Sequence, residues 1–279
     1  MSAVVKVGTG AGMLIMPLVS TWLILSHDWR YAYSILAIVI MIGVFAGALF
    51  LRRDPAEKGL QPYGVSEKDF QDPKVDSGYT LQQALRSKQL WIVCSIYLMI
   101  WYCTQTIMIH IVPHALDLKF SAPQAAGMIS LIGAASIVGR LVMGSTVDKA
   151  GSRRALTISF AVLVAAFSWL QVAKDPWSLY LFVAIYGFAH GAFFALMSPL
   201  IAELFGIRSH GSIFGILLFV GQSGGAVGPI VAGRIFDVTQ SYQLVFIVLL
   251  VASVIGLVLS TLLRPVKAKE EYLTVKGVG

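Results

Sequence analysis

The chain has 279 residues, of which 57% are hydrophobic and only 13% are charged. This composition excludes an ordinary soluble globular domain, in which about a quarter of the residues are charged. The net charge of +7 is distributed over short polar segments between apolar stretches. We therefore predict no nucleic-acid partner, and we expect the lipid bilayer to be the main surrounding of this protein.

Long stretches without Asp, Glu, Lys or Arg follow one another along the chain. An α-helix rises about 1.5 Å per residue, so about 20 apolar residues cross a hydrocarbon core of about 30 Å. Seven stretches reach this length without any charge: 7–25, 31–51, 89–116, 155–173, 176–202, 209–233 and 238–263. An eighth, residues 120–147, contains the single charge of Arg140. The sequence predicts an all-α integral membrane protein with eight transmembrane helices.

Residues 52–88 form the longest polar segment of the chain. Its acidic and basic residues nearly balance, and Pro and Gly recur along it. These features are typical of a solvated linker rather than of a lipid-binding patch. Near the end of the linker, Thr80 and Gln83 have the spacing of a capping box, which predicts the start of a helical turn.

The distribution of Lys and Arg predicts the orientation in the membrane. If the polar linker lies in the cytoplasm, few of the 21 basic residues fall on the outer side. Those outer residues are Arg30, Lys119, Lys174 and Arg234. Cytoplasmic loops carry the excess of Lys and Arg in membrane proteins. We therefore expect both termini to be cytoplasmic.

An internal repeat relates the two ends of the chain. The stretch "VGTGAGMLIMPL" at 7–18 resembles "VGQSGGAVGPIV" at 220–231, since each has several glycines followed by a proline. The repeat predicts that residues 1–51 are the last two helices of a six-helix half. Residues 89–264 then form a complete second half and residues 265–279 a cytoplasmic tail. On this interpretation the chain is a fragment that lacks four helices of the first half.

Two six-helix halves joined by a charged cytoplasmic loop resemble the major facilitator superfamily. The family's loop motif, G-x-x-x-D-x-x-G-x-R-R, is matched by Gly144, Asp148, Gly151, Arg153 and Arg154. The stretches "HIVPHALDLKFS" and "LMSPLIAELFG" resemble the bacterial branch related to monocarboxylate porters and oxalate/formate exchangers. The resemblance covers helices 5 to 12 of a twelve-helix transporter, so we expect a partial facilitator fold.

The resemblance implies a function for the whole chain. It implies secondary active transport of small organic anions, in particular monocarboxylates, by alternating access across a bacterial inner membrane. A proton or a counter-anion is the expected coupling partner. The resemblance implies neither an enzymatic activity nor a cofactor, and the sequence contains no H-E-x-x-H or phosphate-loop motif.

The loop motif is expected to act as a gate. In the family, its acidic residue caps and pairs at a helix end and latches the half in one state. Asp148 also lies close in sequence to the start of the next predicted helix, whose dipole favours a negative charge. The alternative is that Arg153 and Arg154 only anchor the topology.

Arg140 is the expected substrate-binding residue. An arginine deep in a bilayer costs about 2.5–3.5 kcal/mol on insertion scales, so it usually faces a cavity or a partner. The resemblance implies that this position in helix 8 binds the substrate carboxylate, and the guanidinium fork fits that group. The alternative is an arginine that snorkels to the nearby loop. Ser136 stands where the porters carry an acidic residue, which leaves proton coupling open.

Other polar residues in the predicted helices complete the candidate set. His190 lies midway along its apolar stretch, either as a group that titrates near neutral pH or as a neutral structural histidine. Tyr102 and Gln105 share one face of a predicted helix and are expected to line the cavity. Gln222, in the glycine-rich stretch near the C-terminal end, is the remaining predicted substrate-binding residue.

Two alternative functions remain from the sequence. The first is a facilitator of another specificity, such as drug efflux, in which Arg140 would be structural. The second is an intramembrane serine protease, because "GQSGG" around Ser223 has the G-x-S-x-G pattern. No histidine follows Ser223, since the last one is His210. This disfavours the protease.

Overall fold

The structure is a computed structural model, and it describes residues 7–50, 78–173 and 175–263. Within them lie nine α-helices and no β-strand. These helices are α2 (Val7–Ser26), α3 (Trp29–Phe50), α4 (Leu81–Arg86), α5 (Lys88–Asp117), α6 (Ala122–Ala150), α7 (Ser152–Leu170), α8 (Pro176–Phe205), α9 (His210–Thr239) and α10 (Gln243–Leu262). All except α4 are long and apolar enough to cross a membrane. The predicted all-α membrane fold with eight spans is confirmed.

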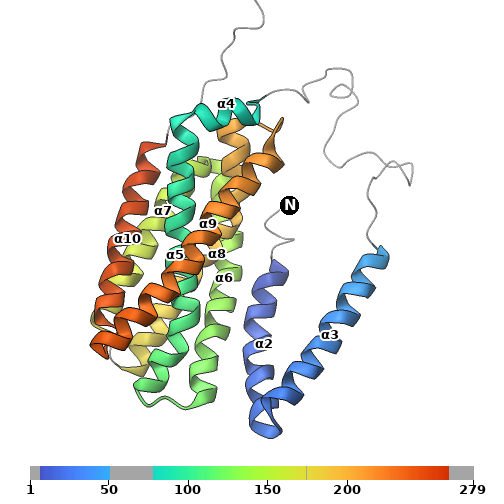
Figure 1. Cartoon of the computed structure of the whole chain (residues 1–279), viewed down its shortest axis with the longest axis vertical. Helices are drawn as coiled ribbons and strands as arrows, with labels where there is room; N and C mark the ends of the chain where they lie inside the picture. Colours follow the sequence, from blue (N-terminus) through green and yellow to red (C-terminus); the bar gives the residue numbers. More distant parts are fainter. Residues whose placement is uncertain (1–6, 51–77, 174, 264–279) are drawn as a thin grey trace, which may run out of the picture. The chain divides into compact units, whose positions relative to one another are not determined.

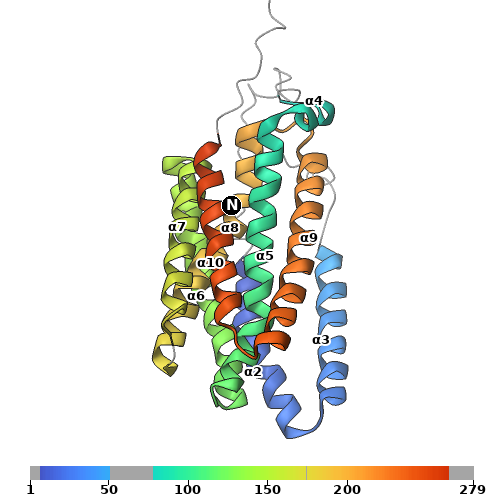
Figure 2. The ribbon, with the colours of Figure 1, turned by 60° about the vertical axis from the view of Figure 1, so that its left-hand side comes forward.

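Helices α5 to α10 form a bundle of long, roughly parallel helices (Figures 1 and 2). The most extensive contacts join α6 to α8 and α5 to α9. Helix α7 packs against α8 and α10, and α10 also packs against α5. Most of the buried apolar side chains lie in this bundle. The bundle covers the residues for which a complete second half is predicted.

Glycines allow α6 and α8 to touch at the level of their backbones. A Cβ atom added to Gly191 would overlap the carbonyl oxygen of Ser136, and one added to Gly139 would overlap the carbonyl oxygen of Phe188. Transmembrane helices associate through such small-residue faces because lipid provides no hydrophobic drive between them. This close approach brings the side chains beside it, including that of Arg140, against the facing helix.

The residues 19–77 form a separate compact unit, of which α3 is the main described part. Trp29, Tyr31 and Tyr33 cluster at the start of α3, and the Trp29 and Tyr33 rings meet edge to face. The Arg30 guanidinium lies 4.3 Å from the centre of the Trp29 ring and 3.7 Å from the Asp28 carboxylate. Aromatic residues with charged neighbours are typical of the membrane–water interface. This places the α2–α3 turn at a membrane surface.

The end of the polar linker is held by specific hydrogen bonds. The hydroxyl of Thr80 accepts a hydrogen bond from the Gln83 backbone at 3.3 Å, and the Gln83 side chain accepts one from the Thr80 backbone at 2.9 Å. This confirms the predicted capping box. The backbone N–H of Tyr79 also donates to the carbonyl of Phe205 at 2.8 Å, which ties this segment to the end of α8. The remainder of the linker lies outside the described residues.

The predicted orientation can be tested with single cysteines in a background without Cys94 and Cys103. The exposed residues Ser241 and Lys149 lie in the α9–α10 turn and at the end of α6. Because the positive-inside rule places Lys149 in the cytoplasm, an impermeant thiol reagent should label Ser241→Cys in intact cells. Lys149→Cys should react only after permeabilisation. Labelling of Lys149→Cys in intact cells would contradict the orientation.

Candidate functional site

Arg140 and His190 are buried together inside the bundle, on α6 and α8. Their side chains are only 1% and 5% exposed. The Arg140 guanidinium carbon lies 5.5 Å from the centre of the Phe194 ring. A cation over an aromatic face gains about 2 kcal/mol when desolvated, which offsets much of the cost of a buried arginine. The guanidinium lies against Phe194 of α8 and against α2, where a Cβ atom added to Gly10 would lie 2.8 Å from its Nη1 atom. It does not extend to the loop, which disfavours the snorkelling alternative.

Phe194 belongs to a row of rings on α8. The Tyr186, His190 and Phe194 rings follow one another at centroid distances of 5.9 and 5.0 Å. Trp101 of α5 meets Phe194 edge to face at 5.8 Å. Among the described residues, His190 Nδ1 and Trp101 Nε1 are buried without a hydrogen-bond partner. An unpaired buried polar atom is costly. Trp101 Nε1 lies toward α9, where a Cβ atom added to Gly221 would be 2.9 Å from it, whereas the His190 ring lies beside Phe194.

Two helices, α5 and α8, position the ring cluster by long-range hydrogen bonds. The Tyr186 hydroxyl donates to the carbonyl of Thr104 at 3.1 Å, which links α8 to α5. The Tyr97 hydroxyl donates to the carbonyl of Met197 at 2.8 Å between the same two helices. Both bonds lie in the apolar interior, where they lack competition from water. They hold α8 against α5 on either side of the cluster.

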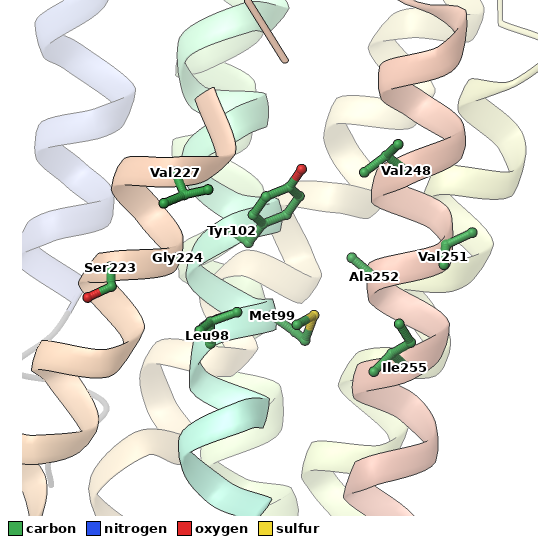
Figure 3. A pocket seen from close by; sticks show the side chains of 10 residues that line it. All are labelled: Leu98, Met99, Tyr102, Ser223, Gly224, Val227, Val248, Val251, Ala252 and Ile255. Atoms are coloured by element: carbon green, nitrogen blue, oxygen red, sulfur yellow. The ribbon is translucent and has the colours of Figure 1, made fainter. Parts of the chain in front are cut away.

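The other predicted binding residues lie elsewhere on α5 and α9. Tyr102 points into a groove toward α10 (Figure 3), although its neighbour Trp101 faces Phe194. Gln105 and Gln222 both flank Gly225: a Cβ atom there would lie 3.0 Å from Gln105 Cγ and 3.5 Å from Gln222 Oε1. The structure therefore brings Arg140 and His190 together, and separately Gln105 and Gln222.

Trp101 and Phe194 are site residues that the sequence analysis did not select. For Phe194 a signal was present, since Tyr186, His190 and Phe194 recur every four residues and so share a helix face. Trp101 had no comparable signal, because tryptophan is common in membrane helices. Its role is visible only from the packing of α5 against α8.

The loop motif lies at the junction of α6 and α7. Gly144 and Asp148 are in the last turns of α6, and Gly151 ends that helix with a φ of 83°. This conformation favours glycine because other residues lack easy access to positive φ. Asp148 is exposed. The carboxylate at the start of α7 is that of Glu203, which accepts the Ser152 backbone N–H at 2.9 Å. Glu203 thus supplies a negative charge at the start of α7, and the role of Asp148 at that helix end stays a prediction.

The basic residues of the motif connect the loop to the last helix. The Arg153 guanidinium donates to the carbonyl of Thr261 at 2.6 Å, near the C-terminal end of α10. A cation at a helix C-terminus also complements the helix dipole. Arg154 is exposed. Through Glu203 and Arg153, the start of α7 contacts the ends of both α8 and α10.

A membrane bundle of apolar helices with a buried cation and a charged loop motif is typical of a membrane transporter. The model of the Major Facilitator Superfamily matches residues 1–185 and 113–277. The chain therefore belongs to this superfamily, and the relatives it matches are named as transporters rather than as enzymes. Ser223, the residue on which the protease alternative depends, donates its hydroxyl hydrogen bond to the carbonyl of Phe219 in its own helix at 3.0 Å.

Individual relatives share the family at low identity. The chain is 26% identical over 266 residues to monocarboxylate transporter 12 of Rattus norvegicus, covering 86% of this chain and 54% of the relative. It is 24% identical over 240 residues to monocarboxylate transporter 4 of Gallus gallus, and the match covers 81% of this chain and 48% of the relative. The uncharacterized MFS-type transporter YhjX of Escherichia coli (strain K12) is 23% identical over 214 residues, covering 75% and 50%. The chain spans about half the length of the curated relatives it matches.

Proposed function

We propose that the chain is part of a secondary active transporter of small organic anions, specifically monocarboxylates, that works by alternating access. The observation that most directly supports this proposal is the buried guanidinium of Arg140 on the face of Phe194, next to the buried His190. Two parallel N–H donors of a guanidinium fix the plane of one carboxylate. The names of the relatives, monocarboxylate transporters 12 and 4, support the same substrate class.

The number of charges supports a substrate with one carboxylate. Arg140 is the only charged residue in the eight long apolar stretches of the sequence. A second carboxylate on the substrate would enter this interior without a matching cation, and an unpaired buried charge is strongly unfavourable. Drug efflux remains the competing function, and it would leave the guanidinium without a role in substrate binding.

The proposal is tested by transport of a labelled substrate. Cells that express the full-length protein should take up radiolabelled lactate with saturation, and unlabelled monocarboxylates should compete. A dicarboxylate such as oxalate should compete much less. Saturable efflux of ethidium without any carboxylate uptake would instead support the drug-efflux alternative.

We further propose that His190 carries the coupling proton. Its Nδ1 atom has no hydrogen-bond partner among the described residues, and a histidine ring can take up and release a proton. His190→Gln should therefore flatten the pH dependence of lactate uptake. His110→Gln is the matched control, because the His110 ring bonds to Tyr242 and Pro229 away from the site. An unchanged pH profile in His190→Gln would indicate a structural histidine or exchange against a counter-anion.

The remaining predicted residues and locations are proposals of the same kind. The loop motif (Gly144, Asp148, Gly151, Arg153 and Arg154) forms the cytoplasmic gate, and contacts such as that between Arg153 and Thr261 break and re-form during transport. Tyr102, Gln105 and Gln222 are secondary candidates for substrate contact. The protein resides in the plasma membrane, in a bacterium the inner membrane, with both termini cytoplasmic.

A further inference from the structure

Helix α2 reaches the guanidinium of Arg140 through a glycine. Gly10 is buried, and a Cβ atom added to it would lie 2.8 Å from Nη1 of Arg140. The same atom would lie 2.6 Å from Cγ1 of Ile137 and 3.2 Å from the hydroxyl oxygen of Ser136. Non-bonded carbon atoms are best separated by about 3.5–4.0 Å. The contact between α2 and α6 therefore leaves no space for a methyl group at position 10.

A second glycine, on α6, brings the backbones of α2 and α6 together. A Cβ atom added to Gly133 would overlap the backbone of Met13 and Leu14. Leu14 lies one turn after Gly10, and Gly133 lies one turn before Ile137, so the two contacts follow one another along antiparallel helices. Small residues allow such close approach between helices in a membrane. The distance between α2 and Arg140 is therefore determined by backbone contact rather than by flexible side chains.

The backbone of α6 is also fixed on α8, which leaves the Arg140 side chain as the part that can move. Cβ atoms added to Gly139 or Gly191 would overlap carbonyl oxygens between α6 and α8. The guanidinium, in contrast, is the far end of a flexible side chain, and the centre of the Phe194 ring lies 5.5 Å from its central carbon. A methyl group at position 10 would therefore displace the guanidinium rather than either helix.

We propose that Gly10 is a positioning residue of the carboxylate site, because its missing side chain leaves the guanidinium of Arg140 in the orientation that a carboxylate requires. This inference rests on the proposed transport of monocarboxylates. Two parallel N–H donors bind one carboxylate only when the plane of the fork matches that of the anion. Helix α2 then forms one side of the site, although the sequence analysis selected no binding residue on this helix.

The kinetics of labelled lactate uptake by the full-length protein test the proposal. Gly10→Ala should raise the KM for lactate about tenfold, since a lost hydrogen bond to a charged group corresponds to that factor or more. The kcat and the amount of protein in the membrane should stay constant, because a loss of uniform binding raises KM alone. Gly8→Ala and Gly12→Ala are the matched controls, since a Cβ atom at either position meets no atom within 4 Å. Both should keep the KM of the unmodified protein.

A double variant separates the position of Arg140 from the packing of α2 on α6. Ile137→Ala removes the closest contact of the added methyl group, that at 2.6 Å, but leaves the contact with Arg140. The high KM should therefore persist in Gly10→Ala/Ile137→Ala when it is compared with Ile137→Ala alone. The same comparison is used if Gly10→Ala by itself does not reach the membrane.

Three results would exclude a positioning role for Gly10 while the unmodified protein still transports lactate. They are an unchanged KM in Gly10→Ala, an equal rise in KM in Gly8→Ala and Gly12→Ala, and a normal KM in the double variant. An unmodified protein without saturable lactate uptake is a different outcome. It would overturn the proposed function, and the assignment of Gly10 with it.

Discussion

Arg140→Lys should abolish most saturable uptake of labelled lactate while the amount of protein in the membrane stays constant. Lysine keeps the positive charge but offers a point contact in place of the planar fork. A hydrogen bond to a charged group contributes about 1.5–3 kcal/mol. Losing one of the two parallel bonds should lower kcat/KM about 10- to 150-fold. The ammonium also loses the planar stacking of the guanidinium on Phe194, which lies 5.5 Å away.

The control for this variant is Arg234→Lys. Arg234 is an exposed arginine on α9, near the end of that helix and outside the Arg140 cluster. Its replacement should leave uptake within twofold of the unmodified protein, since exposed charges contribute little. Normal lactate transport by Arg140→Lys would exclude carboxylate recognition by this residue. The structural role of Arg140 in a drug exporter would then be the better explanation.

Purified residues 1–279 in liposomes should insert but catalyse no saturable carboxylate flux. Alternating access moves two halves of a transporter about a site between them. We assign α5 to α10 to one half and α2 and α3 to the other, and the chain spans 54% and 48% of two monocarboxylate transporter relatives. The proposed site would lack its opposing wall. Arg140 itself is only 1% exposed in this chain, so the expected loss is of the substrate path and not of the burial of the guanidinium.

Complementation separates this explanation from a simple failure to fold. A polypeptide with the first four helices of a facilitator relative, supplied in cis or in trans, should restore counterflow of labelled lactate. The same addition to Arg140→Lys should restore little, which links the recovered flux to the site. Saturable flux by a monomer of residues 1–279 would contradict the prediction. The oligomeric state in the liposomes therefore has to be measured together with the flux.

The membrane fold could be predicted from the sequence because its main constraint is local. A segment that crosses hydrocarbon must be apolar over about 20 residues and must satisfy its own backbone hydrogen bonds. Seven spans are therefore visible as charge-free stretches, and the eighth contains a single charge, that of Arg140. The helix start at Thr80 was equally predictable, because both partners of its capping box lie within four residues.

The contacts of the loop motif could be predicted only in part from the nearby sequence. Spacing identified Gly151 as the break between two helices, and its φ of 83° agrees with this. Spacing also suggested Asp148 as the acid at the next helix start. The structure shows that the carboxylate of Glu203, 51 residues from Ser152, also bonds to that helix start. A contact at that separation depends on how α7 and α8 pack and has no signature in the loop itself.

The sequence by itself determined the class of this protein, its eight spans and the two polar residues, Arg140 and His190, whose burial requires an explanation. Such residues stand out because charge and polarity are expensive in hydrocarbon. Only the tertiary structure decided their surroundings, the face of Phe194 and the edge of Trp101, and only it separated Tyr102 from Gln105. The reason is physical: helical periodicity determines which residues share a face, whereas the packing of small residues determines which neighbour that face meets.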